Sequence, residues 1–380
     1  MKTEQRQWTK EGGWKTISDN GLSGTAQLVL AFGGVDVVAD PARFDEVRAF
    51  YPEAHVLMAS TAGEILGNAV SDGTLALTAV RFEKTRVSFV ETDIQEAAES
   101  EAAGRRLGEG LPKDDLVHAM VFSDGLRVNG TALVNGLLSN LPDAVSVTGG
   151  LVGGGTGFAH TYVGMDKPPQ ERKAVLIGFH GKDLRVGYGS LGGWDPFGVE
   201  RTITKAKDNV LYELDGEPAL DLYKRYLGDQ SAGLPGTGLL FPLEICADPA
   251  YPARRVVRTL LAVDEAAKSI TFAGDMPQGA HARLMKANFD RLVDGAEGAA
   301  TASLAALGGA PELAVLVSCV GRKLVLKERV EDEVEAVIRK TGAGAVIGFY
   351  SYGEICPGVP TERQCQMHNQ TMTVTLFREA

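Results

Sequence analysis

Residues 348–358 read GFYSYGEICPG, and residues 58–67 read MASTAGEILG. In each stretch an apolar run stops at a Gly-Glu-Ile triplet that follows a hydroxyl residue, Ser351 or Thr61, by two positions. The flanking segments match in kind and order: an apolar run (313–322, 28–34), a helix-like segment (327–342, 41–52) and a later apolar run (371–377, 74–82). Short apolar runs bounded by glycine are typical of buried strands. The two stretches therefore indicate a duplicated unit.

A more divergent third unit fills the middle of the chain. Its segments are an apolar run (116–125), a helix-like segment (131–142), and two further apolar runs (144–157, 173–181). A strand, a helix and a second strand in succession favour a right-handed crossover with parallel pairing. We therefore predict an α/β protein of two domains, with mixed sheets built from repeated strand-helix-strand-strand units flanked by helices.

Length and composition limit the function classes. The chain has 380 residues, which exceeds the size of one ordinary hydrophobic core, and a formal net charge of -11 without a basic stripe. Such a charge argues against nucleic-acid binding, which needs clustered cations. No apolar run of about 18 residues and no secretory h-region are present, so we expect no membrane contact and a cytoplasmic location. The four cysteines lack CxxC spacing and are expected to be thiols.

Polar side chains gather where the predicted strands end. Ligands of α/β sheets bind beyond the carboxyl ends of the strands, so we expect these residues to share one small-molecule pocket. The candidate ligand-binding residues are Ser60, Thr61, Glu64, Ser123, Asp124, Cys319, Arg322, Tyr350, Ser351, Tyr352, Glu354, His368 and Asn369. In this pocket Arg322 would hold a carboxylate while Glu354 or Asp124 met an amine, which suits a zwitterion.

Structural roles compete with each of these assignments. Glu64 and Glu354 could instead cap loop amides, and Arg322 could be solvated or paired on the surface. The glycine-rich run 149–157 lacks the Lys-Ser/Thr of a phosphate loop. A cysteine nucleophile with His368 as its base lacks an orienting third group, so we predict no enzyme activity, no catalytic residue and no metal site.

In order along the chain, ASTAGEI, VFSDGL, GGLVGGGTG, NVLYELDGEPALDLYKRYLG, SCVGR, GFYSYGEI and HNQT resemble the FIST family. The resemblance implies an N-terminal extension (1–26), a FIST N-terminal domain (27–218) and a FIST C-terminal domain (219–380). It implies a sensory protein of intracellular signal transduction whose ligand is an amino acid or a similar small polar metabolite. The alternative it offers is a haem-binding nitric-oxide sensor. For a sensor of an amino acid or a similar metabolite, no cofactor is predicted. No kinase or cyclic-dinucleotide domain follows, so we expect output in trans through a histidine kinase or cyclic-di-GMP enzyme.

The region from 185 to 310 is expected to open the second domain. A helix follows a turn at Asp215-Gly216, and residues 254–279 read as two strands joined by a polar turn. Residues 281–309 read as one long helix ended by Gly308-Gly309. Its alanine-rich stripe suits either close helix packing or the interface of a homodimer.

Overall fold

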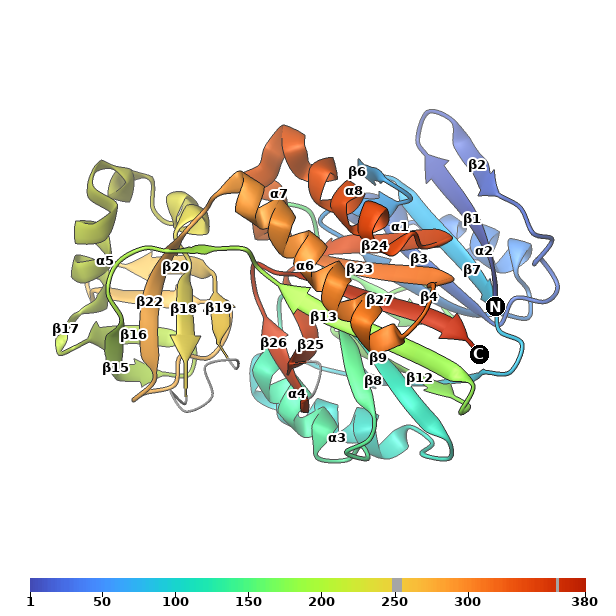
Figure 1. Cartoon of the computed structure of the whole chain (residues 1–380), viewed down its shortest axis with the longest axis horizontal. Coiled ribbons are helices and arrows are strands. Elements are labelled where there is room, and N and C mark those ends of the chain that lie inside the picture. Colours follow the sequence, from blue (N-terminus) through green and yellow to red (C-terminus); the bar gives the residue numbers. More distant parts are fainter. Residues whose placement is uncertain (248–254, 360–361) are drawn as a thin grey trace.

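A computed structural model of the chain describes residues 1–247, 255–359 and 362–380. The protein has a large body and a small lobe, residues 195–287, joined by two connections (Figure 1). The two chain ends lie together at the far side of the body, where the Met1 ammonium is 3.1 Å from Glu312 and 3.4 Å from Glu379.

Three mixed sheets form the body. Sheet 1 has the order β11 (Val163–Met165), β4 (His55–Ser60), β3 (Leu28–Gly33), β7 (Leu75–Arg81), β1 (Lys2–Thr9) and β2 (Gly13–Ser18). Sheet 2 has the order β26 (Glu362–His368), β25 (Gly353–Val359), β10 (Ser146–Leu151), β9 (Leu116–Ser123), β12 (Lys173–His180) and β8 (Arg86–Asp93). Sheet 3 has the order β13 (Leu184–Leu191), β27 (Met372–Glu379), β23 (Leu313–Cys319), β24 (Ala345–Ser351), β5 (Glu64–Leu66) and β6 (Ala69–Ser71).

Each sheet is built around the same three strands. A parallel pair, β3–β4, β9–β10 or β23–β24, is flanked by an antiparallel strand, β7, β12 or β27. The register repeats as well, because Gly33 lies opposite Ser60 and Leu75 while Ser318 lies opposite Tyr350 and Met372. The mixed α/β fold with a repeated strand-helix-strand-strand unit is therefore confirmed.

Each unit contributes one strand to the sheet of another unit. β5 leaves the first unit and pairs with β24 of sheet 3, and β25 leaves the last unit and pairs with β10 of sheet 2. β11 leaves the middle unit and pairs with β4 of sheet 1. No sheet is complete without a strand from another unit, so the N-terminal and C-terminal halves form one body.

The core between the sheets contains a cluster of three phenylalanine rings, one from each unit. Phe32, Phe122 and Phe349 are fully buried, and their ring centroids lie 4.7 to 6.1 Å apart. Burying one such side chain contributes about 1.5–3 kcal/mol. The strand ends of all three units are thereby fixed relative to one another.

Helices cover the outer faces of the sheets: α1 (Val35–Val38), α2 (Pro41–Phe50), α3 (Ser100–Gly110), α4 (Gly130–Leu138), α6 (Phe289–Leu307), α7 (Val320–Leu326) and α8 (Val330–Thr341). Side chains of Asp40, Asn129 and Asn288 cap α2, α4 and α6 by accepting a backbone N–H bond of the first turn. The alanines Ala296, Ala299 and Ala300 are buried within the body. The alanine stripe therefore serves helix packing.

One predicted helix is shorter than expected. Residues 281–286 form a strand, β22, and α6 begins only at Phe289, after the cap residue Asn288. The pairing of β22 with β18 and β15 outweighs local helix preference, because it places these residues in a sheet. The far end agrees with the prediction, since Gly308 ends the helix with a φ of 69°.

The described residues of the small lobe form short strands, which pair antiparallel, and one α-helix. Its elements are β14 (Asp195–Pro196), β15 (Arg201–Lys207), β16 (Val210–Leu214), β17 (Glu217–Pro218), α5 (Ala219–Leu227), β18 (Leu243–Cys246), β19 (Val256–Arg258), β20 (Leu260–Asp264), β21 (Ser269–Phe272) and β22 (His281–Lys286). It has its own apolar core, which includes Leu220, Tyr223, Ile245 and Phe272. The lobe faces α4 and β26 of the body (Figure 1).

Candidate functional site between the lobes

The two Gly-Glu loops have the same hydrogen bonds. Glu64 accepts from the Thr61 hydroxyl at 2.5 Å and from the Thr74 amide and hydroxyl at 2.9 Å. Glu354 accepts from Ser351 Oγ at 2.6 Å, and from the Thr371 amide and hydroxyl at 3.1 and 2.9 Å. Both side chains are buried. This is the geometry of the loop cap, the structural one of the two roles weighed for these glutamates.

Burial dominates the ionisation of both glutamates. It raises the pKa of Glu64 and of Glu354 to about 7, against the hydrogen bonds from hydroxyl and amide groups, which favour the charged form. A neutral carboxylic acid can keep the same partners by donating to one hydroxyl. The two loops are therefore closed by groups that titrate near neutral pH.

Arg322 is fully buried in the body. Its Nε and Nη2 donate to Glu333 at 2.9 and 2.7 Å, and Glu333 also accepts from Ser318 and from the Tyr350 hydroxyl. The guanidinium further donates to the carbonyl oxygens of Gly192 at 2.5 Å and Leu292 at 2.8 Å. The structure thus gives Arg322 a protein partner in place of the predicted ligand carboxylate, and places it where both connections to the small lobe meet the body.

Most of the remaining strand-end residues are also held by hydrogen bonds within the protein. Ser60 donates to Gly153 O, and Asp124 accepts from the amides of Leu126 and Arg127 and from Thr161. Ser123 Oγ is buried without a partner among the described residues. In the last unit, His368 is hydrogen-bonded to Cys356 O and Asn369 is buried beside it. Burial lowers the pKa of His368 to about 4, so its ring is neutral.

The predicted residues do not share one cavity. Thr61 and Glu64 border a cavity of 720 Å³ next to Gly34 and His160. Cys319 and Tyr352 line a different one, described below. The other candidates line none of the cavities described here. The packing of loops 61–63 and 153–161 fills the space above the strand ends, which the sequence pattern does not reveal.

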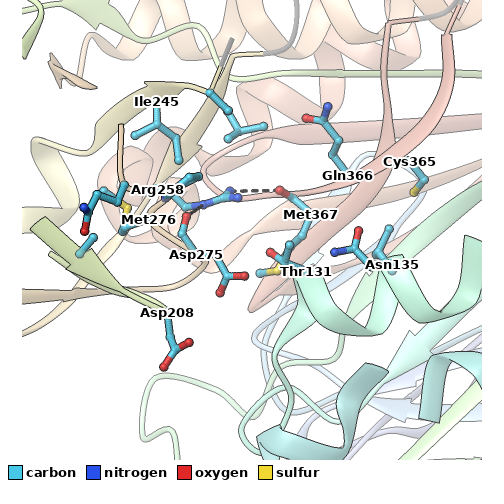
Figure 2. Close-up of a pocket in the computed structure, with 16 residues that line it drawn as sticks. Thr131, Asn135, Asp208, Ile245, Arg258, Asp275, Met276, Cys365, Gln366 and Met367 are labelled. Carbon is cyan, nitrogen blue, oxygen red and sulfur yellow. Dashed lines mark hydrogen bonds between the residues drawn. The ribbon is translucent and has the colours of Figure 1, made fainter. Parts of the chain in front are cut away.

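Two neighbouring cavities lie between the small lobe and the body, and they share Asp208 and Asp275. The first, here called the arginine chamber, has a volume of 580 Å³ and surrounds Arg258 (Figure 2). The small lobe contributes Asp208, Ile245, Val256, Arg258, Asp275 and Met276 to its wall, and α4 and β26 of the body contribute Thr131, Val134, Asn135, Gln366 and Met367.

Arg258 is a buried cation at the junction of the lobes. It is 5% exposed, and its Nε and Nη1 donate to the carbonyl oxygens of Asp275, Val257 and Met367 at 3.2, 3.3 and 3.1 Å. The bond to Met367 crosses from one lobe to the other (Figure 2). Within the described chain, its Nη2 donates to no group and the guanidinium forms no ion pair. Burial lowers the pKa of Arg258 to about 10, so it stays protonated at neutral pH.

Further polar groups of the arginine chamber lack partners. Thr131 Oγ1 is buried without a hydrogen bond, and Asp208 is an exposed residue whose carboxylate is paired with no described residue. Asp275 accepts from Asn129 Nδ2 at 2.9 Å, a second bond between the lobes. One buried cation, two carboxylates and an unpaired hydroxyl therefore border a space with apolar walls.

The second cavity, here called the aromatic chamber, has a volume of 710 Å³. The body contributes Glu101, Leu126, Phe158, Cys319 and Tyr352, and the small lobe contributes Asp208, Thr259, Leu261, Phe272 and Asp275. The rings of Phe158 and Tyr352 stack at 4.7 Å. Burial raises the pKa of the Cys319 thiol, which keeps it protonated and unsuited to nucleophilic attack.

Sequence reasoning missed Arg258, Asp275 and the unpaired threonines. Arg258 interrupts the apolar run VVRTLL (256–261), and a charged residue inside a predicted strand was the available signal. Its hydrogen-bond partner across the cleft, Met367, lies more than 100 positions away in the sequence.

In the described ranges, no three His, Cys, Asp or Glu side chains are grouped so as to hold a metal ion. All six histidines are described, and of these His160 borders the cavity beside Glu64 while none lines either chamber. Over the same residues, no helix has the length and apolar character that a bilayer crossing requires.

Comparison with known proteins gives a family. The FIST N domain matches residues 27–217, and the FIST C domain matches residues 219–357. No curated protein matches the chain. Among solved structures, a cyanuric acid hydrolase from A. caulinodans is similar with 10% identity and a TM-score of 0.38, over 93% of this chain and 90% of that one. FIST domains are sensory domains of signal transduction proteins, and this chain, matched along most of its length, belongs to the FIST family.

Proposed function

We propose that this protein is a sensor that binds a free amino acid in the arginine chamber. The observation that carries the proposal is Arg258, a cation 5% exposed that has no carboxylate partner among the described residues. A buried charge is costly unless it is paired. A ligand carboxylate placed at Nη2 would complete the site through charge-assisted hydrogen bonds.

The other groups of the chamber suit the rest of an amino acid. Asp275 lies next to Arg258, since its own carbonyl accepts from the guanidinium, and its carboxylate and that of Asp208 would receive the α-ammonium group. Thr131 Oγ1 supplies an unused hydrogen-bonding group. Val134, Ile245, Met276 and Met367 form an apolar wall for a side chain. Convergent polar groups in a mostly apolar cavity are typical of small-molecule sites.

Binding would act on the arrangement of the lobes. The chamber is made by both lobes, and the Arg258–Met367 and Asn129–Asp275 bonds already cross it. A ligand that contacts both walls stabilises the closed arrangement by its differential affinity. We propose that a signalling protein in trans, such as a histidine kinase or a cyclic-di-GMP enzyme, reads this change.

Calorimetry with the twenty amino acids at pH 7.5 tests the proposal. We expect saturable binding of at least one of them, and a loss of affinity of about 100-fold or more in Arg258→Met, which is about 2.7 kcal/mol. Arg255→Met is the matched control, because Arg255 lies three residues earlier and is already paired with Glu200 and Glu244. It should change affinity less than about threefold.

Two results would contradict the proposal. One is the absence of binding by every amino acid to the folded wild-type protein. The other is wild-type affinity in Arg258→Met. Circular dichroism and the unfolding midpoint of each variant establish that it is folded before it is titrated.

A further inference from the structure

The aromatic chamber is bordered by charges of one sign. Glu101, Asp208 and Asp275 line it, and its described lining contains no lysine, arginine or histidine. Asp208 accepts no hydrogen bond from a described residue, whereas Glu101 is paired with Arg105 and Asp275 with Asn129. The described lining therefore supplies no positive charge of its own, and the cations beside Glu101 and Asp275, which are Arg105 and Arg258, lie outside it.

Aromatic rings form part of the same wall. Phe158 and Tyr352 stack with an interplanar angle of 27°, and Phe272 lies on the small-lobe side. The faces of aromatic rings attract organic cations, and the attraction strengthens as the cation is desolvated. Rings and carboxylates around one cavity complement the same kind of ligand, an apolar body that carries a positive charge.

Two further observations point to a missing occupant. Thr259 is 5% exposed, lines the chamber, and its Oγ1 has no hydrogen-bond partner in the described chain. Leu126, Phe158 and Leu261 also line the chamber although they are 37%, 47% and 49% exposed. Large apolar side chains left exposed on both walls of one cavity would be covered by a bound ligand.

We infer that the aromatic chamber is a second binding site, whose ligand is an organic cation with an apolar body, of the alkylammonium class. Its charge is met by Asp208 and Asp275, its apolar body by the Phe158–Tyr352 stack, and a hydroxyl or amine on it by Thr259. The two sites share Asp208 and Asp275, but the inference stands on groups that line only the aromatic chamber, Phe158, Tyr352 and Thr259, whereas Arg258 lines only the arginine chamber.

The test compares two probes of equal shape. Choline carries a quaternary nitrogen, and 3,3-dimethylbutan-1-ol has a carbon in the same place. Calorimetry at low salt should show saturable choline binding and at least tenfold weaker binding of the alcohol. Added salt should weaken choline binding, because charge attraction is screened. Equal binding of the two probes, or no saturation by choline, would overturn the inference.

Matched variants locate the site. Phe158→Ala should lower choline affinity at least threefold, while Phe289→Ala, which removes a similarly exposed ring outside the chamber, should not. Asp208→Asn should lower it further, and Glu213→Gln on the same lobe should leave it unchanged. Arg258→Met should preserve choline binding even if it abolishes amino-acid binding. Wild-type choline affinity in Phe158→Ala would refute the assignment to this chamber.

Discussion

At the scale of single residues, the two Gly-Glu loops show how one chemical group serves both halves of the chain. Glu64 and Glu354 accept from matching donors, Thr61 and Thr74 in one loop and Ser351 and Thr371 in the other. The equivalence extends from sequence to hydrogen bonds. It assigns Glu354 to the closure of a loop, since it lines neither chamber.

The raised pKa of Glu354 makes a prediction about pH. Folding raises it from 4.5 to about 7, so the folded state holds a proton that the unfolded state releases in this interval. The contribution of Glu354 to the free energy of unfolding should therefore be fully present below pH 4.5 and be lost as the pH rises to 7. Glu354→Gln is neutral throughout and should reduce this fall, at a cost of about 1 kcal/mol or less at pH 5. Urea unfolding at pH 5 and pH 7.5 measures both effects.

Glu64→Gln is the internal comparison, because the pKa of Glu64 is raised by the same cause. The double variant should have the flattest profile of the four proteins between pH 4.5 and 7. Glu265→Gln, an exposed glutamate paired with Lys224, should keep the wild-type slope. Parallel profiles for wild type and Glu354→Gln would show that the buried acid is not the titrating group. Amino-acid affinity should be unaffected by Glu354→Gln.

At the scale of elements, helices α3 and α4 pack at very close range through glycine. A Cβ on Gly136 would lie 2.0 Å from Glu101 O, and one on Gly104 would lie 2.1 Å from Leu133 O. The position that a Cβ would take is therefore blocked by backbone atoms of the neighbouring helix, which cannot move aside as a side chain could. α4 also carries Thr131 and Asn135 of the arginine chamber, so this contact fixes one wall of the site.

Gly136→Ala should therefore destabilise the protein by about 1–3 kcal/mol, because the two helices must separate. Gly298→Ala in α6 is the control, since its Cβ would meet only Leu191 Cδ1, the mobile end of an exposed side chain. That change should be neutral or stabilise by up to about 1 kcal/mol through the higher helix propensity of alanine. Denaturant midpoints of the two variants give the comparison, and equal midpoints would contradict it.

At the scale of the whole molecule, Arg322 ties the small lobe to the body. It donates to Gly192 O, just before the lobe begins, and to Leu292 O, just after the chain returns to the body. Glu333 balances its charge in a fully buried ion pair. The relative position of the lobes thus depends on one guanidinium that lies outside both chambers.

Arg322→Met should cost about 3–5 kcal/mol, because it leaves Glu333 buried without its cation. Combining it with Glu333→Gln should restore part of the loss by removing the uncompensated charge. Arg329→Met, which breaks exposed ion pairs to Asp290 and Asp332, should leave the unfolding midpoint unchanged. Thermal and urea unfolding measure all three. A wild-type midpoint in Arg322→Met would exclude this role.

The sequence by itself determined the repeated unit and the family. Apolar runs, glycine boundaries and the two Gly-Glu-Ile triplets depend on local spacing, and spacing is visible along the chain. β3, β4 and β7 and their counterparts lie where these patterns predict. The predicted strand-end residues are largely buried for the same reason, since they close the loops that the repeat requires. Cys319 and Tyr352 reach the aromatic chamber.

Only the tertiary structure decided where a ligand could bind. Both chambers are made by segments that are distant in sequence, such as Thr131, Arg258 and Met367, which meet because the small lobe folds back onto α4 and β26. Whether a buried arginine has a carboxylate partner is likewise a matter of long-range packing: Arg322 has Glu333, and Arg258 has none among the described residues. In the sequence, both arginines follow apolar residues, and neither pattern shows a carboxylate partner. The partners that distinguish them come from the packing of other elements, which local pattern does not encode.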